Sequence, residues 1–302
     1  MGLTVSVVSP VYRGADTVEE LHRRLSVVAD GLDDEFEFVF VDDASPDDTS
    51  WDALVRIADR DPRVTAVRLA HNVRQTRAIF AGTELATGEA IVVMDSDLED
   101  PPEVLPVLLE HFRHGHDLVV AARERHRTSF LRRAGSRALN AVAFALGLPI
   151  TDIGSSFLVM ARHVERGVRR ELHRTGIQLV LPSNFASSEH PLTIPVLSAP
   201  PRPSNYASPA LARMGFDFLA VYAAPRASWW CAVASVGSGA LAARRRRSRA
   251  AWLLASSAWL VAGLWLRRVA SRPRRDAAEP LYEIREVVGR HGAGHAPGTR
   301  EA

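Results

Sequence analysis

"VVMDSDLEDPPE", residues 92–103, is the stretch that decides the fold, because apolar residues run directly into acidic ones. An exposed strand alternates apolar and polar side chains, whereas this segment is apolar up to its end and acidic after it. The pattern predicts a buried strand with acids at its carboxyl end, the edge where open α/β sheets bind ligands. The acids are Asp95, Asp97, Glu99, Asp100 and Glu103.

Strand and helix patterns alternate before this stretch. Residues 15–32, for example, place Val18, Leu21 and Leu25 at helical spacing. This alternation predicts an α/β fold in which a parallel sheet carries helices on both faces. The expected strands are 4–12, 36–45, 64–72 and 89–97, and the expected helices are 15–32, 48–61 and 74–88.

The composition limits the alternatives. The chain has 302 residues, 47% of them hydrophobic, which is enough for one large domain or for one domain plus an appendage. Its single cysteine, Cys231, excludes an internal disulfide framework. All basic residues are arginines and the net charge is only +2. Arginine runs bind phosphate and anionic lipid, although compositional bias explains them equally well. We expect no nucleic-acid partner and no signal peptide.

Carboxylates follow two of the predicted strands. Asp42 and Asp43 end one strand, and Asp95, Asp97 and Glu99 follow another. Aspartates also cap helices and make turns, which is the alternative interpretation. Three carboxylates within five residues repel one another, however, and hard oxygen ligands with phosphates are the usual environment of Mg²⁺ or Mn²⁺. We therefore predict a site for a metal ion and a diphosphate.

These motifs resemble those of the inverting family-2 glycosyltransferases. The branch that is most similar contains the polyprenyl-phosphate sugar transferases of the dolichol-phosphate mannose synthase type. The resemblance extends over about residues 4–206 and implies a GT-A fold, in which a nucleotide-sugar donor binds across a Rossmann-like sheet. The motifs that carry it are "PVY" at 10–12, "VDDASPDDT" at 41–49, "AGTELATGEAIVVMDSDLEDPPE" at 81–103 and "DIGSSF" at 152–157.

The resemblance also implies roles for individual residues. On the donor side it implies contacts from Pro10, Tyr12, Asp42, Asp43, Gln75 and Asp95. Asp97 and Glu99 would hold the metal, and Asp97 and Asp152 are the catalytic candidates. Relatives usually have Gln at the position of Glu99, and a carboxylate there still suits a hard cation.

The acceptor side is expected to use arginine. A lipid phosphate is already an anion, so it needs positioning more than deprotonation, and the guanidinium fork matches phosphate oxygens. The resemblance implies that Arg123, Arg132 and Ser136 contact this phosphate. Relatives often continue G-D-F-R where this chain has "GSSF" at 154–157, which leaves the exact acceptor open.

The chain changes character near residue 215. Two uncharged runs, 228–243 and 250–266, have tryptophans near their ends and "RRRR" between them. Each run is slightly shorter than the about 20 residues of a spanning helix. We expect a catalytic domain at 1–214, a membrane-associated helical hairpin at 215–272 and a partly disordered tail at 273–302. The hairpin either spans the membrane or lies in the leaflet, and the catalytic domain is expected on the cytoplasmic side of the cell membrane.

Three functions stay open at this point. The first is transfer of a sugar to a polyprenyl phosphate, and the second is transfer to a glycan or natural-product acceptor. The third is a degenerate membrane partner without activity. Zinc at His111, His114 and His116 is an alternative that the helix-end setting disfavours. A homo-oligomer is left open. Because the alternating pattern is complete before residue 213, a chain ended there is expected to fold and bind donor.

Overall fold

The computed structural model describes residues 2–123, 157–175, 187–197, 257, 261 and 281–290. The chain forms two compact units. One comprises residues 1–173, 178–204 and 277–302, and the other comprises 174–177 and 205–276. The first unit contains the β-sheet and all the strands described below.

The predicted alternation of strands and helices is confirmed over the first hundred residues. The strands are β1 (Thr4–Val11), β2 (Glu35–Asp42), β3 (Val64–Leu69) and β4 (Ala90–Val93), and the helices between them are α1 (Ala15–Asp30), α2 (Thr49–Arg60) and α3 (Gln75–Leu85). The chain continues through η1 (Pro102–Val104), α4 (Leu105–Arg113), β5 (Leu118–Arg123), β6 (Leu158–Ala161), α6 (Arg162–Thr175), β7 (Pro191–Val196) and β8 (Ile284–Gly289).

The eight strands form one mixed sheet in the order β7-β5-β6-β4-β1-β2-β3-β8. The four predicted strands are mutually parallel, as expected from the helices that connect them. Two later strands run against them: β6 is antiparallel to β4, and β8 is antiparallel to β3. The sheet is therefore parallel at its centre and antiparallel where β6 and β8 join it.

Strand β8 was not predicted from the sequence. It lies within the 273–302 segment that was expected to be a partly disordered tail, and it covers the edge of β3. Its sequence, "IREVVG", alternates only briefly and carries charge at its second and third residues. Such a short polar strand is typical of a sheet edge, where a strand needs little apolar surface of its own.

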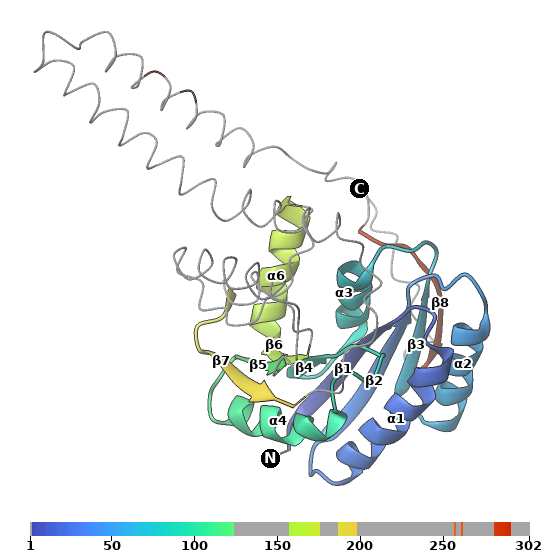
Figure 1. The fold of residues 1–302 in the computed structure, drawn as a ribbon, viewed down its shortest axis with the longest axis horizontal. Helices are drawn as coiled ribbons and strands as arrows, with labels where there is room; N and C mark the ends of the chain where they lie inside the picture. Colours follow the sequence, from blue (N-terminus) through green and yellow to red (C-terminus); the bar gives the residue numbers. More distant parts are fainter. Residues whose placement is uncertain are drawn as a thin grey trace, which may run out of the picture. The chain divides into compact units, whose positions relative to one another are not determined.

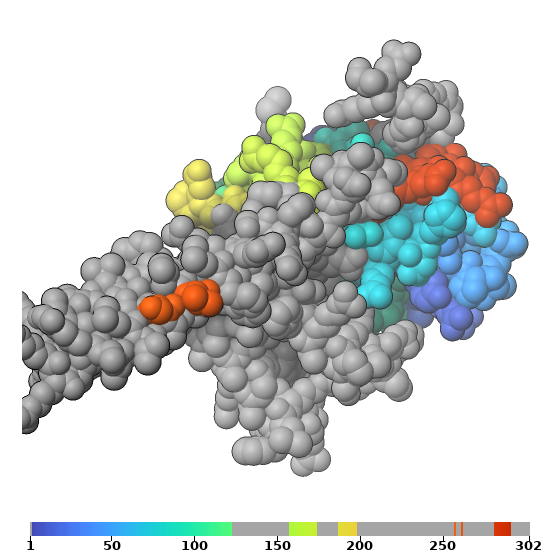
Figure 2. Space-filling view, turned by 90° about the horizontal axis from the view of Figure 1, so that it is seen from above, coloured from blue at the N-terminus to red at the C-terminus, as the bar shows by residue number. Residues whose placement is uncertain are grey.

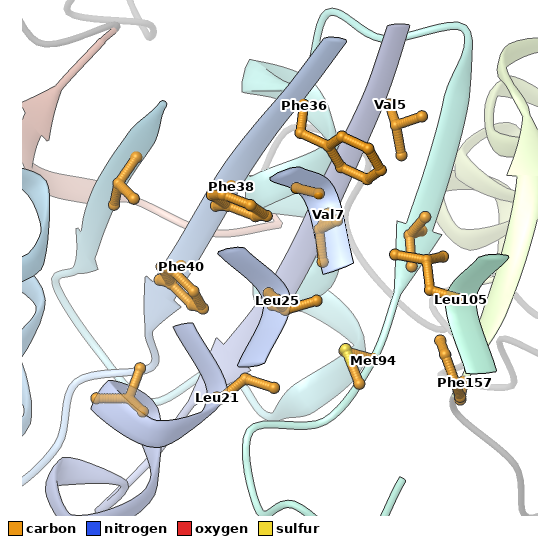
Figure 3. Packing of buried hydrophobic residues seen from close by; sticks show 14 of the residues in the cluster. Val5, Val7, Leu21, Leu25, Phe36, Phe38, Phe40, Met94, Leu105 and Phe157 are labelled. Carbon is orange, nitrogen blue, oxygen red and sulfur yellow. The ribbon is translucent and has the colours of Figure 1, made fainter. Parts of the chain in front are cut away.

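One face of the sheet packs against α1, α2 and α4. Phe36, Phe38 and Phe40 of β2 point to this face, because alternate residues of a strand share a side. They pack with Leu21 and Leu25 of α1, and Figure 3 shows the rings and leucines facing one another. All five side chains are buried, so this cluster fixes the register of the central strands.

The opposite face carries α3 and α6, as Figure 1 shows. Helix α3 comes unusually close to the sheet at Gly82. A Cβ atom at this position would lie 2.4 Å from Val8 Cγ1 and 2.9 Å from Val41 Cγ2. The absence of a side chain at Gly82 therefore allows α3 to lie directly on β1 and β2.

The predicted membrane hairpin at 215–272 lies outside the described residues, apart from Ser257 and Val261, which are helical. Among the helices that the structure describes, none combines the length and apolar character that crossing a bilayer requires.

Candidate active site

The site forms where the strand order reverses. After β1 the chain builds β2 and β3 on one side, and then returns to place β4 on the other side of β1. In open α/β sheets the crevice at such a reversal, outside the carboxyl ends of the strands, is the usual ligand site. The loops that follow β1, β2 and β4 carry Tyr12, Asp43 and Asp95, and Gln75 begins α3 directly after the loop that follows β3.

Backbone strain gathers in these same loops. In the described part of the chain, four residues other than glycine have positive φ angles, and each lies in the loop after one parallel strand. Left-handed backbone costs a residue with a side chain about 1–2 kcal/mol, and such strain concentrates at functional sites. The residues are Arg13 (54°), Ala44 (50°), Arg74 (71°) and Leu98 (63°).

Asp42 ends β2 with a fully buried carboxylate. Its Oδ1 accepts a hydrogen bond from the Ser45 backbone N–H at 3.2 Å, whereas its Oδ2 has no hydrogen-bond partner. Arg68 Nε lies 3.7 Å from Oδ2, and burial raises the pKa of Asp42 above its ordinary value. A buried carboxylate oxygen without a donor is costly for folding, so it fits a group that awaits a ligand.

Asp43 is buried beside Asp42 and connects two loops. Its Oδ1 accepts a hydrogen bond from the Val73 backbone N–H at 2.7 Å, and its backbone oxygen accepts one from Asn72 Nδ2 at 3.0 Å. Burial raises the pKa of Asp43 to about 6. The carboxylate therefore holds the loop after β3 against the end of β2, at a cost in desolvation.

We predict that Asp43→Asn stabilises the free protein at neutral pH. The pKa of Asp43 is higher in the folded protein than in the unfolded chain, so stability falls as pH rises from about 4 to about 6 and stays lower above that range. The amide can still accept from Val73 N–H but carries no charge. We expect the free energy of unfolding of Asp43→Asn to exceed that of the wild type by on the order of 2 kcal/mol at pH 7.

Thermal unfolding from pH 4 to pH 8 tests this prediction. The difference in melting temperature between Asp43→Asn and the wild type should grow through the window from pH 4 to about pH 6. A constant difference across the whole range would contradict the raised pKa. Asp59→Asn, on the exposed surface of α2, is the matched control.

Pro10 and Tyr12 stand at the end of β1. Pro10 is buried, and its backbone oxygen accepts a hydrogen bond from Ser96 Oγ at 2.9 Å, which joins the end of β1 to the loop after β4. The Tyr12 side chain is 47% exposed and packs against Arg13, whose guanidinium carbon lies 5.5 Å from the ring centroid. An exposed aromatic ring beside a cation suits stacking against a planar ligand.

Gln75 and Asp95 meet across the site. Gln75 is the first residue of α3, and its Nε2 donates a hydrogen bond to Asp95 Oδ1. Both side chains are half-buried. The structure thus brings together two residues that are twenty positions apart and that the family resemblance had placed separately at the donor.

Asp97 and Glu99 lie in the strained loop after β4. Asp97 Oδ1 accepts a hydrogen bond from the Glu99 backbone N–H at 2.9 Å, which fixes the turn around Leu98. Both carboxylates are half-buried. Two hard oxygen donors in one turn fit a divalent cation that also binds phosphate oxygens. No cluster of three or more His, Cys, Asp or Glu side chains with metal-binding geometry occurs within the described ranges.

Two supporting residues were missed from the sequence. Arg24 of α1 forms a two-pronged ion pair with Glu103, with Nε 2.8 Å from Oε1, and so ties the acidic loop to the helix. Arg68 lies over the Trp51 ring at 5.7 Å and also pairs with Asp48. Neither arginine belongs to a motif, and only the folded sheet brings them beside the acids. A surface ion pair contributes little to stability, so the main effect of these two arginines is to orient the carboxylates that they contact.

The predicted acceptor residues are only partly described. Strand β5 runs antiparallel to β6, and β6 runs antiparallel to β4, so β5 ends at the same edge as β4. Arg123 is the last residue of β5 and pairs with Val196 of β7. Phe157 is buried at this edge, and its oxygen accepts from the Ala121 N–H at 2.9 Å. Arg132, Ser136 and Asp152 lie outside the described residues.

Sequence comparison supplies relatives with named activities. A protein from Pseudomonas syringae pv. syringae (strain B728a) is 33% identical over 217 residues, which are 71% of this chain and 64% of that protein. One from Sodalis glossinidius (strain morsitans) is 33% identical over 196 residues, or 64% of this chain and 59% of that protein. Both are undecaprenyl-phosphate 4-deoxy-4-formamido-L-arabinose transferases, and this chain spans less than two thirds of their length.

Solved structures share the fold at low sequence identity. Mannosyl-3-phosphoglycerate synthase from Rubrobacter xylanophilus superposes with a TM-score of 0.51 and 16% identity, covering 72% of each chain. Glucosyl-3-phosphoglycerate synthase from Mycobacterium tuberculosis, in complex with Mn²⁺, UDP and phosphoglyceric acid, also gives 0.51, with 20% identity over 72% of this chain and 77% of that one. The predicted GT-A-like α/β fold is thereby confirmed.

The family itself follows from the match to a family model. The model of glycosyl transferase family 2 matches residues 6–172, which include most of β1, all of β2 to β4, the acidic loop after β4 and the strained turns around the site. This range is more than half of the chain. The sheet order, the paired acids and this match agree, and the chain belongs to glycosyl transferase family 2.

Proposed function

We propose that this protein is a metal-dependent, inverting glycosyltransferase that moves a sugar from a nucleotide-diphosphate donor to a polyprenyl phosphate at the membrane. The observation that carries the proposal is the convergence of Asp43, Asp95 and Asp97 on loops at one reversal of strand order. The names of the relatives, which are undecaprenyl-phosphate sugar transferases, support the acceptor class.

The donor nucleoside would lie over the ends of β1 and β2. Tyr12 offers an exposed ring for stacking, and the buried carboxylates of Asp42 and Asp43 can accept hydrogen bonds from a base or a ribose. Asp42 Oδ2 has no hydrogen-bond donor, and burial raises the pKa of Asp43, so both carboxylates are energetically unfavourable in the free protein. A ligand that donates hydrogen bonds to them would offset this cost. Asp95, held by Gln75, would face the sugar side of the donor.

Asp97 and Glu99 would hold a Mg²⁺ or Mn²⁺ ion on the diphosphate. A divalent cation in this place would neutralise the charge that develops on the leaving nucleoside diphosphate. The hydrogen bond that the Glu99 backbone N–H donates to Asp97 Oδ1 keeps the turn in a set conformation before the donor arrives. Such preorganisation lowers the cost of ordering the loop when the donor binds.

The transfer itself is a single in-line displacement. A phosphate oxygen of the acceptor forms a bond to the anomeric carbon while the bond to the donor diphosphate breaks, so the anomeric configuration inverts. The acceptor phosphate is already an anion, so it needs no general base. Arg123, Arg132 and Ser136 would position it, and Asp152 would act near the reacting carbon. The proposal for Arg123 rests on its place at the carboxyl edge of β5.

The apolar runs within 215–272 would attach the protein to the membrane that contains the acceptor. The proposed location of the catalytic domain is the cytoplasmic side of the cell membrane. Arginines flank both runs, and anionic headgroups attract such clusters by about 1 kcal/mol for each basic residue near the surface. Membrane attachment would present the lipid phosphate at the site.

Calorimetric titration of the full-length protein with UDP and GDP, each with and without Mn²⁺, tests donor binding. We expect one of the two nucleotides to bind, and to bind more weakly when EDTA replaces Mn²⁺. The absence of binding by either nucleotide in the presence of Mn²⁺ would contradict the proposed donor class.

Arg123→Ala is predicted to weaken use of the acceptor selectively. A hydrogen bond to a charged group contributes about 1.5–3 kcal/mol, so kcat/KM for undecaprenyl phosphate should fall roughly tenfold to a hundredfold. The dissociation constant of the donor nucleotide should stay close to the wild-type value. Arg60→Ala, on the exposed surface of α2, is the matched control and should change neither quantity.

A loss of donor affinity in Arg123→Ala that is as large as its loss of kcat/KM for the acceptor would contradict this assignment. A wild-type enzyme that transfers sugar to a soluble glycan, and not to the lipid phosphate, would instead support the glycan or natural-product acceptor. The departure from family pattern at residues 154–157 makes this second outcome worth measuring.

A further inference from the structure

A partly buried polar cluster lies at the end of α3 that is farthest from the donor loops. Its members are Thr83, Glu84, Glu165, Arg169 and Tyr282. Arg169 Nη2 donates to Glu165 Oε1 at 2.7 Å, to Thr83 Oγ1 at 2.9 Å and to the Phe80 backbone oxygen at 3.1 Å. Glu165 is only 3% exposed. The guanidinium therefore joins α6 to the last turn of α3, where a cation also complements the helix dipole.

Tyr282 adds the C-terminal segment to this cluster. Its hydroxyl donates a hydrogen bond to Glu84 and accepts one from Arg169 Nη1 at 3.2 Å. Burial raises the pKa of the Tyr282 phenol well above its usual value, so the hydroxyl keeps its proton at neutral pH. The hydrogen bond between Tyr282 and Glu84 ties Glu84, an exposed residue of α3, to a residue 198 positions later in the chain.

The same C-terminal segment supports the loop that follows β3. The Glu283 backbone oxygen accepts a hydrogen bond from the Ala70 N–H at 2.9 Å, and β8 then pairs with β3. In Figure 2, residues 281–290 form the red surface beside the cyan part of the chain. Loop 70–74 also carries Val73, whose backbone N–H donates to the Asp43 carboxylate at the donor site. The loop therefore contacts the C-terminal segment at Ala70 and the donor site at Val73.

Helix α3 connects this support to the site. Its first residue, Gln75, binds Asp95, and its last turn is held by Arg169 and Tyr282. The helix has eleven residues, and it lies on the sheet at Gly82 without space for a Cβ atom. A short helix that is packed this closely offers a rigid connection between its two ends.

We propose that Tyr282 is a positioning residue for donor binding, acting through α3 on Gln75 and through Glu283 on loop 70–74. This inference rests on the proposed donor site. It gives the segment after the predicted hairpin a role in the reaction. Within the described part of the chain, β7 and β8 are the two edge strands of the sheet.

The test uses the full-length protein with Tyr282→Phe, which removes the hydroxyl and keeps the ring. Calorimetric titration with UDP and GDP in the presence of Mn²⁺ should give a dissociation constant about threefold to tenfold higher than that of the wild type. The melting temperature should change little. Amide hydrogen exchange at residues 70–77 should be faster without any ligand. Arg285→Ala, an exposed residue of β8, is the matched control and should alter none of these values.

A double-mutant cycle separates positioning from general destabilisation. Because Tyr282 acts in part through Gln75, the loss of nucleotide affinity in the combined Tyr282→Phe and Gln75→Ala variant should be smaller than the sum of the two separate losses. Unchanged affinity and exchange in Tyr282→Phe, or fully additive effects in the double variant, would overturn the inference. If the wild type binds neither nucleotide, the proposed function fails, and the exchange data alone then decide whether Tyr282 holds α3 and its loop.

Discussion

Asp97→Ala is expected to abolish sugar transfer. The variant removes one of the two carboxylates proposed to hold the cation on the diphosphate, so charge on the leaving group would build up without compensation. Turnover should fall by at least about a thousandfold, comparable with the loss of a major electrostatic group in other enzymes. Asp97→Asn keeps the bond from Glu99 N–H but removes the charge, and it should be impaired nearly as strongly.

The measurement is the rate of product formation under saturating donor and acceptor, with a titration of Mn²⁺. Glu89→Gln is the matched control, because Glu89 is exposed in the loop that precedes β4, at the opposite end of that strand. Near-normal turnover in Asp97→Ala, or a wild-type rate that EDTA leaves unchanged, would show that the metal site is wrongly assigned.

A chain that ends after Glu279 is expected to be much less stable than one that ends after Arg290. The shorter chain loses β8, Tyr282 and the buried Leu281, and it exposes the edge of β3. The lost apolar burial and backbone pairing should lower the free energy of unfolding by about 3 kcal/mol or more, which corresponds to a melting temperature roughly 10 °C lower. An open strand edge also favours aggregation.

Both chains keep the predicted hairpin, so the comparison isolates the strand. We expect scanning calorimetry, with all proteins in one detergent, to give the same melting temperature for the chain ended after Arg290 and for the full-length protein. Equal melting temperatures for the two truncated chains would mean that β8 contributes little to the fold. A chain ended near Arg213 would also lack β8, so the same measurement on that chain tests the expectation that it folds and binds donor.

The central sheet was predictable because its signals are local. Each of the first four strands is a short apolar run, each helix has apolar residues at helical spacing, and the connections are short. The acids at the strand ends could be assigned to one edge for the same reason, since parallel strands end together. Asp42, Asp43, Asp95 and Asp97 accordingly lie where the sequence indicated.

The remaining features depend on contacts between distant residues. Strand β8 has a weak pattern of its own and forms because β3 offers it an open edge. Arg24 and Glu103, which form an ion pair, are 79 positions apart. The contacts of Arg169 outside its own helix also reach residues that are more than 79 positions away. The positive φ angles at Arg13, Ala44, Arg74 and Leu98 could not be predicted, because none of these positions is a glycine.

Incubation of the purified full-length protein with undecaprenyl phosphate, Mn²⁺ and a panel of radiolabelled nucleotide sugars tests the central claim most directly. We predict that label from one donor enters the organic phase, in a product with the mass of undecaprenyl phosphate plus one sugar and with inverted anomeric configuration. Asp97→Ala should give no such product. Failure of every donor to yield a lipid-linked sugar, with label appearing instead only in water-soluble acceptors, would contradict the claim.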